Sequence, residues 1–421
     1  MKLAVYQIGL GSFGRYGFEK FLEMHNHFEE VDIEFKGLCD TDFDKREKVE
    51  RFAESQGVNI EIYDKVENLY SDASQLDQNI LIYDAGPTDT HASNIYRSMS
   101  HGFYHLAEKP PSMKRQQHLK EKQLAEKNSV MWKVDFVERE NPVVKKTREL
   151  LKGKELERIK VFRESSVGIE KLINPAERHG IKGGDILDKM IHEAYILDFL
   201  ESAEKDTNIE LKEANTKYFM PWKPGSQKML GLNGGYTEEI SYNTATAQTQ
   251  AVLVSEDAEI NLNSSWLGLS KECRIEAKKA EEELGVKVVD SEYSETKDTA
   301  FINEEARFFI VEGETCLLGD MLHKKLYDLD KGETIELDYY LHDQLYRVIR
   351  KAVLDASKNK DSKTSLSKDT DIFMNTIFDI KENIIEGDYL EELDSSLERF
   401  KSLVVEDGKV LETEEPELIL S

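Results

Sequence analysis

The chain has 421 residues, of which 39% are hydrophobic and 33% charged, which predicts a folded globular protein of two or three domains. Its formal net charge of −27 repels phosphate backbones and anionic lipids, so we expect no nucleic-acid or membrane partner. Three scattered cysteines match no disulfide framework and no zinc spacing, which favours a reducing compartment, so we expect a cytoplasmic protein.

Apolar runs alternate with helical patterns in the first part of the chain. No run approaches the roughly 20 residues of a membrane span, and the N-terminus is typical of a first strand, not of a signal peptide. We expect strands at 2–8, 32–39, 79–85, 103–107 and 130–136, with helices at 13–25, 43–56, 89–101 and 112–127. This alternation predicts an α/β domain over residues 1–140, a doubly wound parallel sheet of the Rossmann type.

The pattern changes after Asn141-Pro142. We expect helices at 143–152, 185–201, 339–356 and 371–386, and strands at 157–164, 209–216, 237–243, 246–254, 258–266 and 306–318. Such a succession of strands indicates a large, mostly antiparallel open sheet. We therefore expect a second α/β domain over 141–400, which binds substrate and forms oligomers, followed by an acidic tail over 401–421.

A glycine-rich turn follows the first strand directly and opens the first helix. Its sequence is Gly9-Leu10-Gly11-Ser12-Phe13-Gly14, a G-x-G-x-x-G in the context that a dinucleotide site requires. The first glycine permits the tight turn, the second leaves room for the pyrophosphate, and the third lets helix and strand pack closely. The helix N-terminus offers N–H groups to phosphate. We expect Gly9, Gly11, Ser12, Phe13 and Gly14 to bind the cofactor.

Asp40 ends the second strand, where a carboxylate can accept hydrogen bonds from the adenosine ribose. The same charge repels a 2′-phosphate, so NAD is favoured over NADP. In the alternative interpretation Asp40 only caps the following helix, a role that Asp42 can also fill.

Three further segments carry a resemblance to a known family. They are Ala85-Gly86-Pro87-Thr88-Asp89-Thr90-His91, Ala107-Glu108-Lys109-Pro110-Pro111, and Gly183-Gly184-Asp185-Ile186-Leu187-Asp188-Lys189-Met190-Ile191-His192. Together with the glycine turn and Asp40, they resemble the glucose–fructose oxidoreductase / inositol dehydrogenase family, known as Gfo/Idh/MocA. The clear similarity covers about residues 1–200.

The resemblance implies an NAD- or NADP-dependent enzyme that oxidises or reduces hydroxyl groups of sugars and cyclitols. It implies that Lys109 contacts the reacting hydroxyl and that Asp188 and His192 form the catalytic acid/base pair. It also implies that Pro87 and His91 line the nicotinamide end and that Glu108 contacts the cofactor, and it implies homodimers or homotetramers. Tyr195 and Met190 depart from the family pattern near the substrate, which blurs the identity of the substrate more than the reaction.

These residue types suit the chemistry. Asp188 and His192 stand at i and i+4 of the expected helix and so share a face, where a carboxylate can orient an imidazole that titrates near neutrality. An ammonium at Lys109 can stabilise alkoxide character. The alternatives are a chance pair on a surface helix and a solvated lysine. His192, Asp188 and His179 lack a supported ligand spacing, so we expect no metal.

Substrate contacts are less specific in the sequence. Arg178 lies with His179 and Lys182 just before the second glycine pair, where a basic cluster can meet an anionic substrate or simply form a solvated loop. Tyr195 extends the face of Asp188. Trp222 and Trp266 either stack on a sugar or pack in the core. We expect one face of the second sheet to be apolar and exposed, with Tyr218, Phe219, Tyr242, Trp266 and Phe309 as candidates, and to mediate oligomer formation.

The sequence thus predicts an NAD(P)-dependent oxidoreductase acting on a hydroxyl or carbonyl of a small sugar, sugar derivative or cyclitol. Two alternatives remain at this point: a non-catalytic dinucleotide-binding sensor or regulator, and an NAD-dependent glycosidase of the same family. A sensor has no need of the proton-handling set of Lys109, Asp188 and His192, so the enzyme is favoured.

Overall fold

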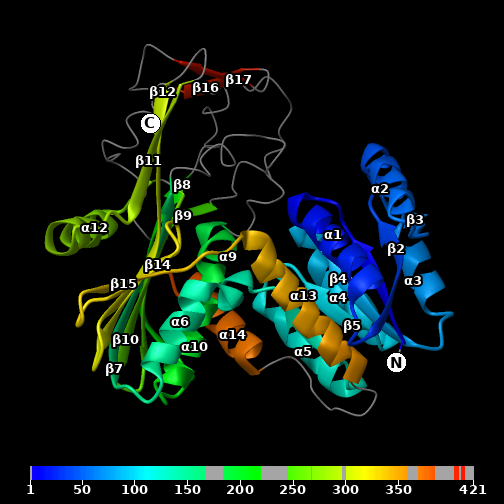
Figure 1. Cartoon of the computed structure of the whole chain (residues 1–421), viewed down its shortest axis with the longest axis horizontal. Helices are drawn as coiled ribbons and strands as arrows, with labels where there is room; N and C mark the ends of the chain where they lie inside the picture. Colours follow the sequence, from blue (N-terminus) through cyan, green and yellow to red (C-terminus); the bar gives the residue numbers. More distant parts are fainter. Residues whose placement is uncertain are drawn as a thin grey trace. The chain divides into compact units, whose positions relative to one another are not determined.

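The computed structural model describes residues 2–165, 184–219, 245–266, 268–295, 300–358, 368–384, 403–406 and 409–412 (Figure 1). The chain divides into two compact units, Met1–Asn141 with Tyr339–Asn375 and Pro142–Asp338 with Thr376–Ser421. We expected residues 141–400 to form a single second domain; instead, the segment 339–375 packs within the first unit.

The first unit is built on a parallel sheet with the strand order β3-β2-β1-β4-β5-β6. The strands are β1 (Lys2–Ile8), β2 (Asp32–Cys39), β3 (Glu61–Tyr63), β4 (Asn79–Asp84), β5 (Tyr104–Ala107) and β6 (Trp132–Val134). The helices are α1 (Ser12–His27), α2 (Phe43–Ser55), α3 (Val66–Ala73), α4 (Thr88–His101) and α5 (Arg115–Asn128), followed by the 3₁₀ turn η1 (Val137–Glu140). The predicted doubly wound Rossmann fold is confirmed.

Alternate residues of β1 supply two different cores. Leu3 and Val5 face a cluster that α1 and α13 (Leu341–Lys358) cover, whereas Ala4 and Tyr6 face a cluster that α3 covers. This period of two is what a sheet with helices on both faces requires.

Helix α13 explains why the chain returns to the first unit. Its apolar residues Leu345, Ile349 and Val353 are buried in the same cluster as residues of α1 and β1. Asn79 also donates to the carbonyl oxygen of Ala356 at 3.0 Å. An amphipathic pattern predicts a helix, but not which sheet receives its apolar face.

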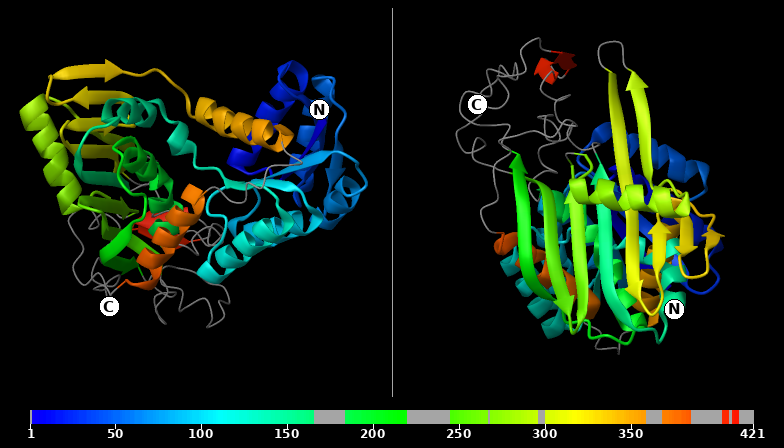
Figure 2. Two further views of the ribbon diagram at one scale, coloured as in Figure 1. Left: turned by 90° about the horizontal axis from the view of Figure 1, so that it is seen from below. Right: turned by 90° about the vertical axis from the view of Figure 1, so that its left-hand side faces the viewer.

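The second unit contains a sheet with the order β15-β14-β13-β12-β7-β10-β9-β8, and β11 pairs with β12 (Figure 2). The strands are β7 (Leu156–Ser165), β8 (Glu210–Phe219), β9 (Ala245–Ser255), β10 (Ala258–Ser265), β11 (Val289–Glu295), β12 (Ala300–Gly313), β13 (Leu317–Asp320), β14 (Lys325–Asp328) and β15 (Glu333–Glu336). β7 and β10 pair in parallel, and the other recorded pairs of this sheet are antiparallel. The expected mostly antiparallel sheet is confirmed.

Helices pack on both faces of this sheet. On one face α12 (Lys271–Leu284) covers an apolar cluster that includes Phe162 and Phe308, as the right-hand view of Figure 2 shows. On the other face lie α9 (Gly184–Asp188), the 3₁₀ segment η3 (Met190–Tyr195) and α10 (Ile196–Ser202). The unit also contains α6 (Pro142–Leu151), which contacts α10, and α14 (Lys368–Glu382) spans the division between the units.

The expected exposed apolar face is wrong for the residues whose side chains are described. Phe309 is 0% exposed and packs against Tyr195 and Phe199, and Trp266 is 1% exposed. The side chains of Tyr218 and Phe219, and all of Tyr242, lie outside the described residues. Homo-oligomer formation stays a prediction.

Part of the expected C-terminal tail has regular structure. Two short strands, β16 (Leu403–Glu406) and β17 (Lys409–Glu412), form an antiparallel pair within the segment 401–421.

The packing of α13 leads to a stability prediction. Ile349→Ala should lower the free energy of unfolding of the first unit by about 2–5 kcal/mol, because it leaves a cavity under α13. Lys351→Ala, on the exposed face of the same helix, is the matched control. Urea unfolding monitored by circular dichroism measures both; equal midpoints for the two variants would show that α13 does not stabilise this unit.

Candidate functional site

The glycine turn after β1 is shaped for a ligand. A Cβ atom on Gly9, whose φ is +87°, would lie 2.4 Å from the carbonyl oxygen of Ala85, and one on Gly14 would lie 2.3 Å from the carbonyl oxygen of Gly9. Both positions therefore require glycine for packing. A Cβ on Gly11 would meet nothing within 4 Å. The packing of the fold therefore does not require glycine at position 11, and the space beside it is open to a ligand.

Helix α1 begins at Ser12 with Gly11 as its N-cap, and Phe13 packs against the core behind the turn. A glycine cap supplies no side-chain oxygen, so the N–H groups of the first turn remain available to an anion. The turn fits the pyrophosphate of a dinucleotide.

Asp40 is tied to this turn. Its Oδ2 accepts a hydrogen bond from the Leu10 N–H at 2.6 Å, and its Oδ1 accepts one from the Asp42 N–H at 2.8 Å. Asp42 caps α2 by accepting from the N–H groups of Asp44 and Lys45. The capping alternative for Asp40 is therefore excluded. A carboxylate offers about four lone-pair sites, so two remain for a ribose diol.

His91 is a buried bridge, 1% exposed, between two loops at the strand ends. Its Nδ1 lies 2.8 Å from the carbonyl oxygen of Pro110, and its Nε2 lies 2.9 Å from that of Gly86. An imidazolium donates to both oxygens, and a neutral ring to only one. We predicted that His91 and Pro87 line the nicotinamide end. The structure buries His91 between the two loops, whereas Pro87 is exposed at the N-terminus of α4, and its contact with the nicotinamide end stays a prediction.

Lys109 follows the end of β5, above a buried pair of acids. Tyr83 donates to Glu108 Oε1 at 2.7 Å, and the buried carboxyl group of Asp135 lies close enough to Glu108 for the two charges to interact. Burial raises the pKa of Glu108, and it raises that of Asp135 well above its usual range. Two buried carboxyls in contact share a proton, because both cannot ionise. Glu108 is therefore buried next to Lys109 in the chain, and its contact with the cofactor stays a prediction.

Sequence reasoning missed Asp135. The available signal was a single carboxyl in the mostly apolar segment 130–136, whose other charged residue is Lys133. Its backbone N–H donates to the Ala107 carbonyl oxygen at 2.8 Å, which holds it beside the end of β5.

In the second unit, the expected helix 185–201 is broken. α9 ends at Asp188, and Lys189 keeps right-handed helical angles of φ −104° and ψ −57° at the junction. His192 lies in the 3₁₀ segment η3, inside which Glu193 departs from helical geometry with φ −81° and ψ 15°. The spacing of four therefore does not place Asp188 and His192 on one face of a continuous α-helix, and the argument from helical spacing is wrong.

Asp188 and Asp185 stand three residues apart and differ in their surroundings. Asp185 is buried and accepts hydrogen bonds from Thr249 Oγ1 at 2.9 Å and Ser264 Oγ at 2.6 Å. The half-buried Asp188 accepts one from Trp266 Nε1 at 3.1 Å. Asp185 anchors α9 to the sheet, whereas Asp188 is held at an accessible edge. Trp266 packs in the core and donates to the Asp188 carboxylate, so of its two expected roles the structure supports core packing and not stacking on a sugar.

The predicted substrate residues fall elsewhere. Tyr195 is 0% exposed, with ring contacts to Phe199 and Phe309 at centroid distances of 5.3 and 5.7 Å, so it is a core residue. Arg178, with His179 and Lys182, lies outside the described residues.

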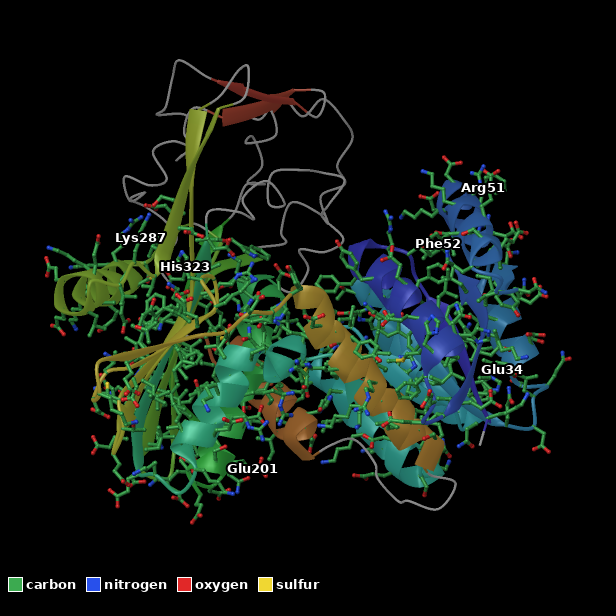
Figure 3. The ribbon with its side chains drawn as sticks, in the orientation of Figure 1. Glu34, Arg51, Phe52, Glu201, Lys287 and His323 are labelled. Carbon is green, nitrogen blue, oxygen red and sulfur yellow. The ribbon has the colours of Figure 1, made fainter. Side chains whose placement is uncertain are left out.

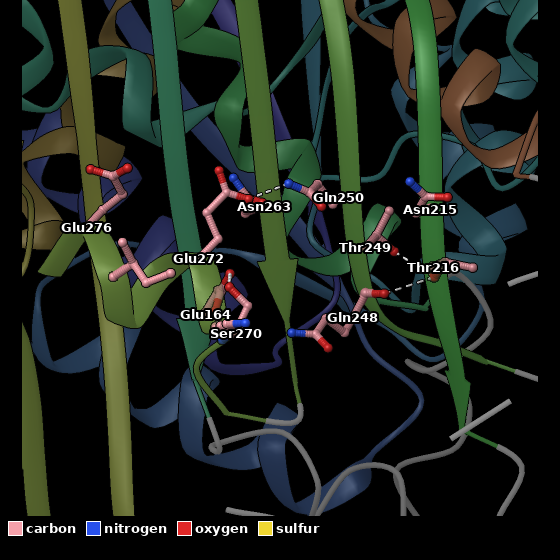
Figure 4. A pocket seen from close by; sticks show the side chains of 12 residues that line it. Glu164, Asn215, Thr216, Gln248, Thr249, Gln250, Asn263, Ser270, Glu272 and Glu276 are labelled. Atoms are coloured by element: carbon pink, nitrogen blue, oxygen red, sulfur yellow. Dashed lines mark hydrogen bonds between the residues drawn. The ribbon is translucent and has the colours of Figure 1, made fainter. Parts of the chain in front are cut away.

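A polar cavity of about 600 Å³ opens on the α12 side of the second sheet (Figure 4). Amide and carboxylate side chains line it, among them Asn215, Gln248, Gln250 and Glu272. Among the described residues, none of the predicted site residues lines this cavity.

Within the described ranges, no group of three or more His, Cys, Asp or Glu side chains is placed to hold a metal ion. No helix in the same part of the chain is both long and apolar enough to cross a membrane.

Comparisons with known proteins agree with this geometry. Residues 3–136 match the model of the Gfo/Idh/MocA family, described as an oxidoreductase family with an NAD-binding Rossmann fold. The matched residues contain all six strands of the parallel sheet in the first unit, apart from Lys2 at the start of β1. No curated protein matches the sequence significantly.

Solved structures share the fold along nearly the whole chain at low sequence identity. A levoglucosan dehydrogenase in complex with NADH and levoglucosan matches with a TM-score of 0.61 and 12% identity, covering 92% of this chain and 97% of the other. The UDP-N-acetylglucosamine 3-dehydrogenase of Acidithiobacillus ferrooxidans matches with a TM-score of 0.58, 13% identity and coverages of 91% and 98%. The myo-inositol 2-dehydrogenase of Lactobacillus plantarum matches with a TM-score of 0.56 and 13% identity, covering 91% of this chain and 97% of the other.

The acid pair predicts a pH dependence of stability. Because the folded state raises the pKa of Asp135, the free energy of unfolding falls as pH rises above the unfolded value of about 4. The free energy of unfolding of Asp135→Asn should not fall in this way, because an amide does not ionise. Between pH 5 and pH 8 it should therefore rise by about 1–3 kcal/mol relative to that of the parent protein.

Chemical denaturation at several pH values measures this gain. Glu54→Gln, which changes an exposed carboxylate of α2, is the control and should follow the parent at every pH. A constant difference between Asp135→Asn and the parent across this range would contradict the shared proton.

Proposed function

We propose that this chain, whose residues 3–136 form an NAD-binding domain of the Gfo/Idh/MocA oxidoreductase family, is a dehydrogenase of sugars, sugar derivatives or cyclitols. It transfers a hydride between NAD and the carbon of a hydroxyl or carbonyl group. The observation that carries the proposal is the open position at Gly11, at the start of α1 and beside Asp40. The solved dehydrogenases named above, which share the fold, support the substrate class.

Binding of the cofactor is assigned to the first unit. The N–H groups at the start of α1 bind the pyrophosphate, and Asp40 accepts the ribose hydroxyls. When bound, NAD supplies the hydride acceptor or donor.

Proton handling is assigned to Lys109, Asp188 and His192. In the oxidation direction, the hydroxyl loses its proton to the His192 imidazole while its carbon loses a hydride, and a carbonyl forms. The Lys109 ammonium hydrogen-bonds the oxygen and stabilises its alkoxide character. Asp188, held by Trp266, orients the imidazole.

A turnover screen tests the proposal. The full-length protein is mixed with NAD and a panel of myo-inositol, levoglucosan, UDP-N-acetylglucosamine and simple aldoses, and the NADH absorbance band is followed. Growth of the band with one member supports the proposal. Tight NAD binding without turnover on the panel would favour a sensor, and hydrolysis of aryl glycosides without net NADH would favour a glycosidase.

Variants of Lys109 and His192 should lose turnover while keeping their affinity for NAD. Lys109→Met and His192→Ala should each lower kcat about 100- to 10,000-fold, whereas the dissociation constant of NAD should stay within a few-fold. Asp188→Asn should lose less, because Asp188 orients the base and does not take the proton.

The matched controls are surface residues of the same units. Lys114→Met changes an exposed lysine at the start of α5. His323→Ala changes a histidine paired with Asp320 and Asp290 (Figure 3). Near-parent kcat in Lys109→Met would contradict the assignment.

The charge of Asp40 should determine the preference for NAD over NADP. Asp40→Ser removes the charge that repels a 2′-phosphate, so NADP should bind more tightly relative to NAD. Calorimetric titration with each cofactor measures the ratio, with Asp44→Ser as an exposed control on α2. A parent protein that already binds NADP more tightly than NAD would overturn the role of Asp40.

A further inference from the structure

Lys189 lies between the two proposed proton-handling residues of the second unit, and the proposed function gives it no task. It occupies the junction between α9 and η3. The ends of the two parallel strands β7 and β10 lie beside it.

The side chain of Lys189 holds both strand ends. Its Nζ donates to Ser165 Oγ at 2.6 Å, at the end of β7, and to the Ser265 carbonyl oxygen at 2.5 Å, at the end of β10. One ammonium thus bridges the last residues of two adjacent strands.

A second hydrogen bond runs in the opposite direction. Trp266, the residue after Ser265, donates from Nε1 to the carboxylate of Asp188, the residue before Lys189. Asp188 and Lys189 follow one another in the chain, and so do Ser265 and Trp266. The first of each pair therefore bonds to the second of the other. We call the pairs Lys189–Ser265 and Trp266–Asp188 the crossed clamp.

The backbone of Lys189 extends the clamp to His192. Its N–H donates to the Asp185 carbonyl oxygen at 2.7 Å and so closes α9. Its carbonyl oxygen accepts from the His192 N–H at 3.0 Å and so opens η3. A shift of Lys189 would move the main chain on both sides of the break.

A lysine is costly in this position. Burial lowers the pKa of Lys189 to about 7, opposed by the nearby charges of Asp188, Asp185 and Glu305. Removing an ammonium from water costs free energy unless hydrogen bonds replace its hydration. A methionine of similar length would avoid this cost but would lose the hydrogen bonds of Nζ to Ser165 and Ser265.

We propose that Lys189 is a positioning residue for the proposed proton transfer, which through the crossed clamp fixes the Asp188 carboxylate and the turn that carries His192. This inference rests on the proposed function for its catalytic consequence. The clamp itself is a property of the fold that can be tested without substrate.

The indole N–H of Trp266 reports on the clamp. The full-length protein, labelled with ¹⁵N-tryptophan, has three indole signals, from Trp132, Trp222 and Trp266, and Trp266→Phe assigns the third. In Lys189→Met the Trp266 signal should shift upfield as its hydrogen bond to Asp188 weakens. Lys160→Met, which removes a lysine of β7 that pairs with Glu276 of α12, is the control and should leave the signal in place.

Two further variants keep this measurement decisive. Lys189→Arg keeps a cationic donor and should restore part of the shift. Ser165→Ala removes one acceptor only and should produce a smaller shift of the same sign, even if Lys189→Met fails to fold. An unmoved Trp266 signal in folded Lys189→Met, or in Ser165→Ala where the former does not fold, would overturn the clamp.

Activity then tests the positioning role, with whichever panel compound the parent protein oxidises. Lys189→Met should lower kcat by about 100-fold, the cost expected of a displacement of about 1 Å, and leave the dissociation constant of NAD unchanged. Lys189→Arg should recover part of kcat. A shifted Trp266 signal with parent kcat would overturn the positioning role alone. Parent kcat in His192→Ala would overturn the proton-handling role of His192 and leave the clamp standing, and no turnover of the parent protein on any panel compound would count against the proposed function alone.

Discussion

Adjacent parallel strands must end at the same edge of a sheet, and both units of this protein place their candidate chemistry at such an edge. In the first unit, the turn at Gly9, the loop at Gly86 and the residue Lys109 follow β1, β4 and β5. In the second unit, β7 and β10 form the parallel pair among the recorded strand pairs of a sheet that is otherwise antiparallel. The crossed clamp lies at the ends of that pair, so the polarity of two strands determines where Asp188 and His192 are held.

Local signals in the sequence predicted most of the first unit. The strands, the glycine turn and the position of Asp40 follow from runs of neighbouring residues, and the structure adds the reason for each glycine. Long-range decisions were not available in the same way. The apolar stripe of α13 predicts a helix, but only the structure shows that Ile349 packs against the first sheet.

The second unit shows what a periodic pattern hides. A spacing of four suggested one helix through Asp188 and His192, but the side-chain bonds of Lys189 and Asp185 to the sheet accompany a break between them. Tyr195 and Trp266 resembled ligand contacts because aromatic residues suit both cores and sugar sites. Burial alone distinguishes the two roles, and a single sequence does not give burial.

Several ionisable groups inside this acidic protein lie against a specific partner. Asp185 accepts from two hydroxyls, Glu108 accepts from Tyr83, and the half-buried Lys189 bonds to two serines. Breaking one such pair leaves a buried polar group unsatisfied, which costs more than the bond itself contributes. The groups that carry proposed chemistry, Lys109, Asp188 and His192, are half-buried, and each is next to Glu108 or Lys189 in the chain or bonded to it. Hydrogen-bonded neighbours can therefore hold the direction of accessible side chains without burying them.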